Sequence, residues 1–115
     1  MNAPNPREIL SRYWNYKTFR PLQEDIINSI LSGNDTLALL PTGGGKSICF
    51  QVPALCNEGI CIVISPLIAL MKDQVQHLND KGIPAAAVFS GMRFDQIQNT
   101  LLDAASGKIK FLYLS

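Results

Sequence analysis

A glycine-rich segment that runs into a lysine and a serine is the part of this sequence best suited to chemistry. It reads Pro41-Thr42-Gly43-Gly44-Gly45-Lys46-Ser47. Consecutive glycines let backbone N–H groups converge on an anion, and the N-terminus of a following helix adds partial positive charge. Lys46 would reach the terminal phosphates of a triphosphate, and the Ser47 hydroxyl would bind Mg²⁺, whose other ligands are water and phosphate oxygens. The segment predicts a phosphate site in which Lys46 and Ser47 carry the catalytic roles.

The elements expected on either side strengthen this prediction. Thr36 to Leu40 is a short apolar run, typical of a strand buried on both faces, and Lys46 to Leu55 is expected to be a helix that Pro53 kinks or ends. A glycine-rich loop between a strand and a helix is the setting of a phosphate loop. The strict pattern GxxxxGK[ST] asks for glycine at Leu40, which this sequence lacks. A glycine-rich turn with an incidental lysine is the less favoured alternative.

Helices and strands are expected to alternate along the whole chain, as in βαβ units. Helices are predicted over Arg7 to Tyr13, Pro21 to Gly33, Leu67 to Asn79 and Phe94 to Ala105, and further strands over Ile60 to Ser65, Ala85 to Phe89 and Lys110 to Ser115. This order predicts an α/β fold with an open parallel sheet of four strands and flanking helices. Ligands of such sheets bind at the carboxyl ends of the strands.

Composition limits the class of protein. The chain has 115 residues, of which 47% are hydrophobic and 17% charged, which indicates one globular unit rather than a disordered segment. No apolar run approaches the roughly 18 to 20 residues that a membrane span needs, so we expect an intracellular, cytoplasmic protein with no membrane partner. A formal net charge of +1 neither favours nor excludes nucleic acid. Three cysteines without CxxC spacing indicate reduced thiols rather than a zinc site.

Two further segments resemble motifs of the RecQ family of superfamily 2 DNA helicases, and Pro41 to Ser47 matches the superfamily's form of the phosphate loop. Phe19-Arg20-Pro21-Leu22-Gln23 resembles motif 0, and Val63 to Val75 resembles motif Ia. The resemblance extends from Ile9 to Ser115. It implies a partial RecA-like P-loop NTPase domain, with residues 1–115 as the N-terminal part of the first motor domain.

The resemblance also implies roles for single residues. Tyr16 and Arg20 would sandwich the adenine ring of ATP while Gln23 pairs with its edge, although Trp14-Asn15 stands where the family often has Phe-Gly. The alternative is that the aromatic residues belong to the core and that Gln23 is a surface amide. Ser65 and Lys72 would contact the backbone of single-stranded DNA. Their alternative roles are a helix cap and a solvated lysine.

The function that the resemblance implies is an ATP-dependent 3′–5′ DNA helicase acting in recombination and repair, with ATP, Mg²⁺ and single-stranded or partly duplex DNA as ligands. No Asp-Glu pair follows any predicted strand, and the family's DEAH motif would come after Ser115. We therefore expect this chain alone to bind nucleotide but not to hydrolyse it efficiently. A non-catalytic module that binds ATP or single-stranded DNA is the alternative. A small P-loop kinase is disfavoured because it explains neither motif 0 nor motif Ia.

Overall fold

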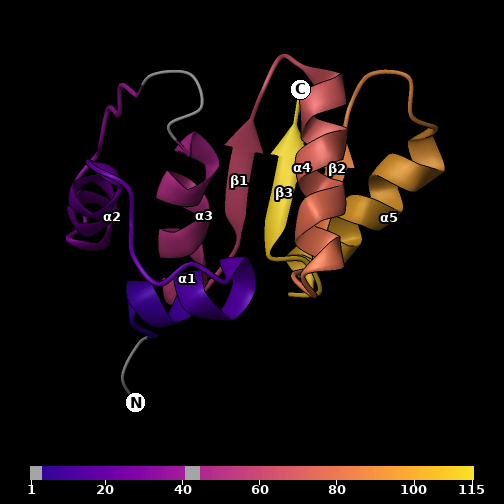
Figure 1. Ribbon diagram of the computed structural model, residues 1–115. Coiled ribbons are helices and arrows are strands. Elements are labelled where there is room, and N and C mark those ends of the chain that lie inside the picture. The colour runs from indigo at the N-terminus through magenta and orange to yellow at the C-terminus, as the bar shows by residue number, and fades with distance from the viewer. Residues whose placement is uncertain (1–3, 41–44) are drawn as a thin grey trace. The chain divides into compact units, whose positions relative to one another are not determined.

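The computed structural model describes residues 4–40 and 45–115 (Figure 1). The chain divides into two compact units, an N-terminal unit (Met1–Glu58) and a C-terminal unit (Gly59–Ser115). None of the helices in the described residues combines the length and hydropathy that crossing a membrane requires.

The N-terminal unit is built from helices around a small apolar core. Its helices are α1 (Pro6–Trp14), α2 (Gln23–Leu31) and α3 (Lys46–Cys56). The core joins all of them, because Leu10 of α1, Ile27 of α2 and Val52 of α3 are each almost fully buried in one cluster. Asn5 begins α1 by accepting a hydrogen bond from the backbone N–H of Arg7 at 2.8 Å, as an N-cap residue does.

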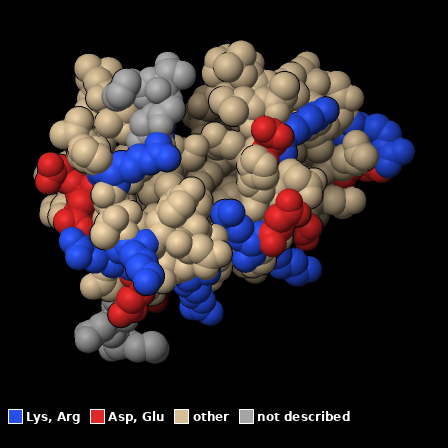
Figure 2. All heavy atoms as spheres, viewed as in Figure 1, with Lys and Arg blue, Asp and Glu red and all other residues tan. Residues whose placement is uncertain are grey.

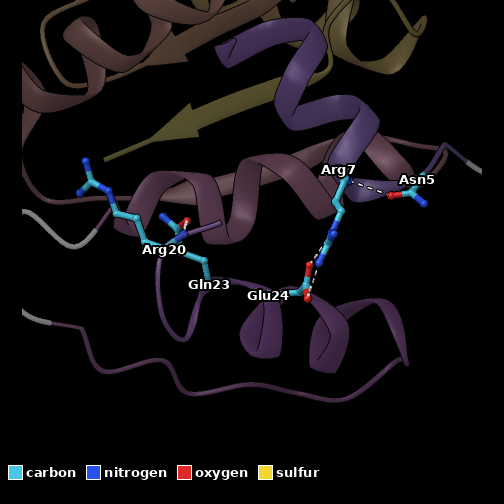
Figure 3. A network of polar contacts seen from close by, with 5 residues as sticks. All are labelled: Asn5, Arg7, Arg20, Gln23 and Glu24. Atoms are coloured by element: carbon cyan, nitrogen blue, oxygen red, sulfur yellow. Dashed lines mark hydrogen bonds and ion pairs between the residues drawn. The ribbon is translucent and has the colours of Figure 1, made fainter. Parts of the chain in front are cut away.

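An ion pair joins α1 to α2 at the surface of this unit. Arg7 donates to the Glu24 carboxylate at 2.9 Å, and Figure 3 shows the contact between the two helices. This hydrogen bond from Arg7 lowers the pKa of the Glu24 carboxyl. Both side chains are largely exposed, so the pair orients the helices more than it stabilises them.

The C-terminal unit holds a parallel sheet with flanking helices, which confirms the predicted fold class. Its elements are β1 (Cys61–Ile64), α4 (Ile68–Asp80), β2 (Ala85–Val88), α5 (Phe94–Ala105) and β3 (Phe111–Leu114). The strand order is β1-β3-β2, and Tyr113 of β3 stands beside Val63 on one side and Ala87 on the other. Both neighbours run parallel to β3, and the arrowheads of β1 and β3 in Figure 1 point the same way.

The central strand β3 lies between β1 and β2, and its side chains belong to the core of this unit. Phe111 and Tyr113 are at most 1% exposed. The Tyr113 hydroxyl donates to Gln74 Oε1 of α4 at 2.7 Å, so the one polar atom of this buried ring has a partner. Each expected element of this unit matches an observed one to within a few residues.

The expectation of a buried strand over Thr36 to Leu40 is wrong. The segment has no regular secondary structure, and Leu37 and Leu39 are 87% and 81% exposed. A strand needs a neighbour for its backbone N–H and C=O groups and apolar cover on its faces. Thr36 to Leu40 pairs with no strand in the described residues. The sheet formed by these residues has three strands, and four were predicted.

The start of α2 differs from expectation, whereas α3 matches the helix expected over Lys46 to Leu55 to within one residue. α2 begins at Gln23 rather than Pro21, because Leu22 has φ 72°, a left-handed conformation that no helix continues through. Pro53 does not end α3, which runs on to Cys56. Pro53 is buried, and the packing of this turn outweighs the single backbone hydrogen bond that proline removes.

The three cysteines are free thiols. Cys49 and Cys56 are buried in the N-terminal unit, and Cys61 of β1 is half-buried. Burial raises the pKa of each thiol, which keeps it protonated and unreactive at neutral pH. Their packing is that of small apolar side chains.

Candidate functional site

A cavity of about 310 Å³ in the N-terminal unit brings together residues from two separate segments. Its lining residues are Trp14, Tyr16, Thr18, Arg20, Gln23, Gly45, Ser47 and Ile48. The first five belong to the stretch from the end of α1 to the start of α2, and the others to the start of α3. The volume is at the lower end of the range for small-molecule sites, roughly 300 to 1,000 Å³.

Gln23 forms the polar connection between the two segments. Its side chain is 2% exposed, and its Oε1 accepts a hydrogen bond from the backbone N–H of Arg20 at 2.8 Å. Its Nε2 donates to the backbone carbonyl of Gly45 at 3.1 Å. In Figure 3 the side-chain amide of Gln23 lies beside Arg20. The alternative of Gln23 as a surface amide is therefore wrong.

Gly45 occupies a position that only glycine fits. It precedes α3 with φ 76° and ψ 43°, in the left-handed region where a β-carbon is unfavourable. A β-carbon there would also collide with Nε2 of Gln23 and approach Cδ of Arg20. Glycine has no side chain that could cap the helix that follows.

The turn before Tyr16 is left-handed at Asn15. Asn15 ends α1 with φ 60° and ψ 24°, and its N–H donates to the carbonyl of Ser11 at 3.1 Å. Asparagine is one of the few residues besides glycine that adopts this left-handed conformation readily. Tyr16 is then 51% exposed at the cavity, and it is not a core residue.

Three lining residues were not predicted from the sequence: Trp14, Thr18 and Ile48. Trp14 packs against the core cluster and makes an edge contact with the ring of Tyr13 at 6.3 Å between centroids.

The phosphate-loop lysine lies apart from this cavity. Lys46 is exposed and lines a second, smaller cavity of about 200 Å³ together with apolar residues of α2, α3 and the segment before the loop. Ser47, the next residue, lines the larger cavity. Thr42, Gly43 and Gly44, which complete the predicted phosphate cradle, lie outside the described residues together with Pro41.

Ser65 and Lys72, the residues expected at DNA, belong to the C-terminal unit. Ser65 follows β1, and its Oγ accepts from the backbone N–H of Leu67 at 3.2 Å, so the side chain caps the turn before α4. Lys72 lies in α4 with its ammonium 4.7 Å from the ring centroid of Phe89. Both β1 and β2 run parallel to β3. Ser65, which follows β1, and Phe89, which follows β2, therefore lie at the same end of the sheet, where the strands have their carboxyl ends.

Charge is mixed on the face that Figure 2 shows, where acidic and basic side chains alternate over both units. This agrees with the formal net charge of +1. Long-range attraction therefore cannot select a polyanion for this chain, and recognition of one would depend on local contacts.

Comparison with known proteins identifies the family. A family model described as DEAD/DEAH box helicase matches residues 20–114. The chain is 47% identical over 108 residues to an ATP-dependent DNA helicase RecQ of Synechocystis sp., which covers 94% of this chain and 23% of the relative. It is 45% identical over 115 residues to RecQ of Haemophilus influenzae, covering 100% of this chain and 19% of the relative. A probable ATP-dependent DNA helicase RecS of Bacillus subtilis is 44% identical over 109 residues, and the match covers 95% of this chain and 22% of the relative.

The chain thus spans about a fifth of the length of the curated relatives that it matches. The match to the family model includes most of the chain, from Arg20 in the cavity to Leu114 in the central strand. The chain therefore belongs to the DEAD/DEAH box helicase family, with RecQ helicases among its relatives.

Proposed function

We propose that this chain is the nucleotide-binding portion of an ATP-dependent 3′–5′ DNA helicase that couples ATP hydrolysis to DNA unwinding in recombination and repair. The cavity that joins Tyr16, Arg20 and Gln23 to the start of α3 is the observation that carries the proposal. The names of the relatives supply ATP and DNA as ligands of those proteins. The direction of unwinding and the role in repair rest on the RecQ resemblance.

In this proposal the base occupies the cavity side formed by residues 14–23. Tyr16 and Arg20 offer a ring and a planar guanidinium, both of which stack on a base. The Gln23 amide both donates and accepts hydrogen bonds, which matches the N6 donor and N7 acceptor of adenine. Guanine presents two acceptors at the corresponding edge, so the site favours ATP over GTP.

The phosphates would extend from the cavity toward the start of α3. Residues 42–45 would supply backbone N–H groups, Lys46 a mobile positive charge, and Ser47 a hydroxyl oxygen for Mg²⁺. A hydroxyl is a hard oxygen donor of the kind that Mg²⁺ accepts. Phosphate oxygens and water would supply most of the other ligands, and the ion would neutralise phosphate charge.

We place the DNA contact at the carboxyl end of β1, where the chain leads into α4. Ser65, the N–H groups that open α4, and Lys72 would bind phosphates of a single strand without reading its bases. None of the three described strands is followed by an Asp-Glu pair. From the RecQ resemblance, and because the chain spans about a fifth of the length of its relatives, we infer that residues 1–115 form the N-terminal part of a first RecA-like motor domain whose efficient hydrolysis and unwinding need residues outside this sequence.

Replacing Tyr16 by alanine tests the base site. Stacking of a base on an aromatic ring contributes about 1 kcal/mol at the low end, so Tyr16→Ala should weaken Mg·ATP binding by about fivefold. Trp14 is the single tryptophan of the chain and lines the cavity, so its fluorescence can follow the titration beside calorimetry. Phe94→Ala is the matched control, since it removes an aromatic side chain that is 78% exposed in the other unit. Equal ATP affinity in Tyr16→Ala and the unaltered chain would remove Tyr16 from the site.

A further inference from the structure

The ammonium group of Lys72 is held by an aromatic ring rather than by an acid. Its nitrogen lies 4.7 Å from the ring centroid of Phe89, a distance at which the face of an aromatic ring attracts a cation. Lys72 lies in α4 and Phe89 directly follows β2, so the contact joins two elements of the C-terminal unit. The ion pairs within the described residues use other cations, so no carboxylate there neutralises Lys72.

An aromatic partner orients an ammonium group without neutralising it. A carboxylate would cancel the charge of Lys72 and would compete with a phosphate for its N–H donors. A ring attracts the cation through its quadrupole, so the charge remains and the N–H groups directed away from the ring stay available. Lys72 is exposed, so an anion in solution can reach it. Fixing one conformation of a flexible lysine in advance also lowers the entropy cost of binding that anion.

The backbone at Phe89 is fixed by a turn that is closed in both directions. The Phe89 N–H donates to Sδ of Met92 at 3.4 Å, and the Met92 N–H donates to the Phe89 carbonyl at 3.4 Å. Gly91, inside this turn, has φ 99°, a conformation that favours glycine. The residue before Phe89 is Val88, the last residue of β2, which pairs with Leu114 of the central strand. The half-buried ring of Phe89 therefore starts from a fixed position.

Given the DNA contact proposed above, we propose that Phe89 is a positioning residue for that contact. Its ring holds the Lys72 ammonium at the carboxyl end of the sheet, the end at which Ser65 also lies. Phe89 itself binds no phosphate. It fixes one positive charge at the same end of the sheet as a hydroxyl and the N–H groups that open α4, a set that suits the phosphates of a single strand and reads no base.

The test follows the binding of a short fluorescein-labelled oligo(dT) by anisotropy at several salt concentrations. Phe89→Leu keeps an apolar side chain but removes the ring. Its affinity should fall by about threefold, and the slope of log affinity against log salt should become less steep, by up to about 0.7 for one lost phosphate contact. Phe89→Tyr keeps the ring and should bind as the unaltered chain does.

Two further measurements separate positioning from a general structural role. The ring current of Phe89 should shift the ε-methylene protons of Lys72 upfield in the NMR spectrum, and Phe89→Leu should abolish this shift. In a Lys72→Ala background, Phe89→Leu should cause no further loss of affinity, because the ring then has no cation to hold. Phe94→Leu is the matched control, since it removes an aromatic ring that is 78% exposed in the same unit and should leave DNA binding unchanged.

The outcomes distinguish the positioning role from the DNA contact on which it rests. Weaker binding in Lys72→Ala with unchanged affinity and salt slope in Phe89→Leu would overturn the positioning role and leave the contact intact. Additive losses in the double variant would do the same, because the ring would then act without the lysine. Phe89→Met also lacks the ring and has the same expectation if Phe89→Leu does not fold. Equal DNA affinity in Lys72→Ala and the unaltered chain would overturn both roles.

Discussion

Lys46→Ala should weaken Mg·ATP binding by at least about tenfold while leaving the stability of the chain nearly unchanged. Hydrogen bonds to charged groups contribute about 1.5 to 3 kcal/mol, and the lysine would meet the most highly charged part of the ligand. Lys46 is exposed at the first position of α3, where truncation of a side chain removes little packing. Calorimetric titration with Mg·ATP and urea unfolding together measure both quantities.

Lys108→Ala is the matched control for this substitution. Its side chain is 73% exposed in the C-terminal unit and lies 3.9 Å from the Asp103 carboxylate. It should bind Mg·ATP as the unaltered chain does, because removing one surface positive charge changes only the general electrostatic attraction. If Lys46→Ala and Lys108→Ala bind equally well, the glycine-rich segment is not a phosphate site.

Gly45→Ala should lower the free energy of unfolding by about 2 kcal/mol or more and should also remove ATP binding. A left-handed backbone costs an L-residue about 1 to 2 kcal/mol, and the added β-carbon collides with the Gln23 amide in addition. The collision can be relieved only by moving the amide or the first turn of α3, and either change disrupts the cavity. Urea unfolding and the ATP titration should therefore both respond.

Gly33→Ala isolates the backbone part of that effect. Gly33 also lies in the N-terminal unit with φ 86°, but a β-carbon there would meet no atom within 4 Å. This variant should lose only the roughly 1 to 2 kcal/mol of backbone strain and should keep its ATP affinity. Equal losses of stability and equal ATP affinities in the two variants would mean that the Gln23 contact has no energetic role.

The sequence was sufficient for features that depend on neighbouring residues. The helical spacing of Ile9, Leu10 and Tyr13 predicted α1, and the alternation of strands and helices after residue 59 predicted the C-terminal unit almost residue for residue. The resemblance to motif 0, rather than any periodicity, grouped Tyr16 with Arg20 and Gln23, and all three line one cavity. These features are set by local periodicity and by short turns.

Features that depend on distant partners were not predictable in the same way. The apolar run from Thr36 to Leu40 has the composition of a strand, yet a strand forms only beside another strand. The contact between Gln23 and Gly45 joins residues 22 positions apart, and no spacing rule indicates it. Leu22 is left-handed although leucine disfavours that conformation. The turn that contains it is closed by the hydrogen bond from the Gln23 N–H to the Arg20 carbonyl, and this turn sets its backbone angles.

The central claim is that residues 14–23 and the start of α3 form one adenine nucleotide site, and a ¹⁵N–¹H NMR titration of the 115-residue chain with Mg·ATP tests it most directly. We predict that the largest shifts fall on the backbone amides of residues 14–23 and 45–48 and on the side-chain amide of Gln23. Mg·GTP at the same concentration should shift the first group less, because it cannot pair with the Gln23 amide in the same way. Saturable binding whose shifts lie elsewhere, or no shift in a folded chain, would contradict the account.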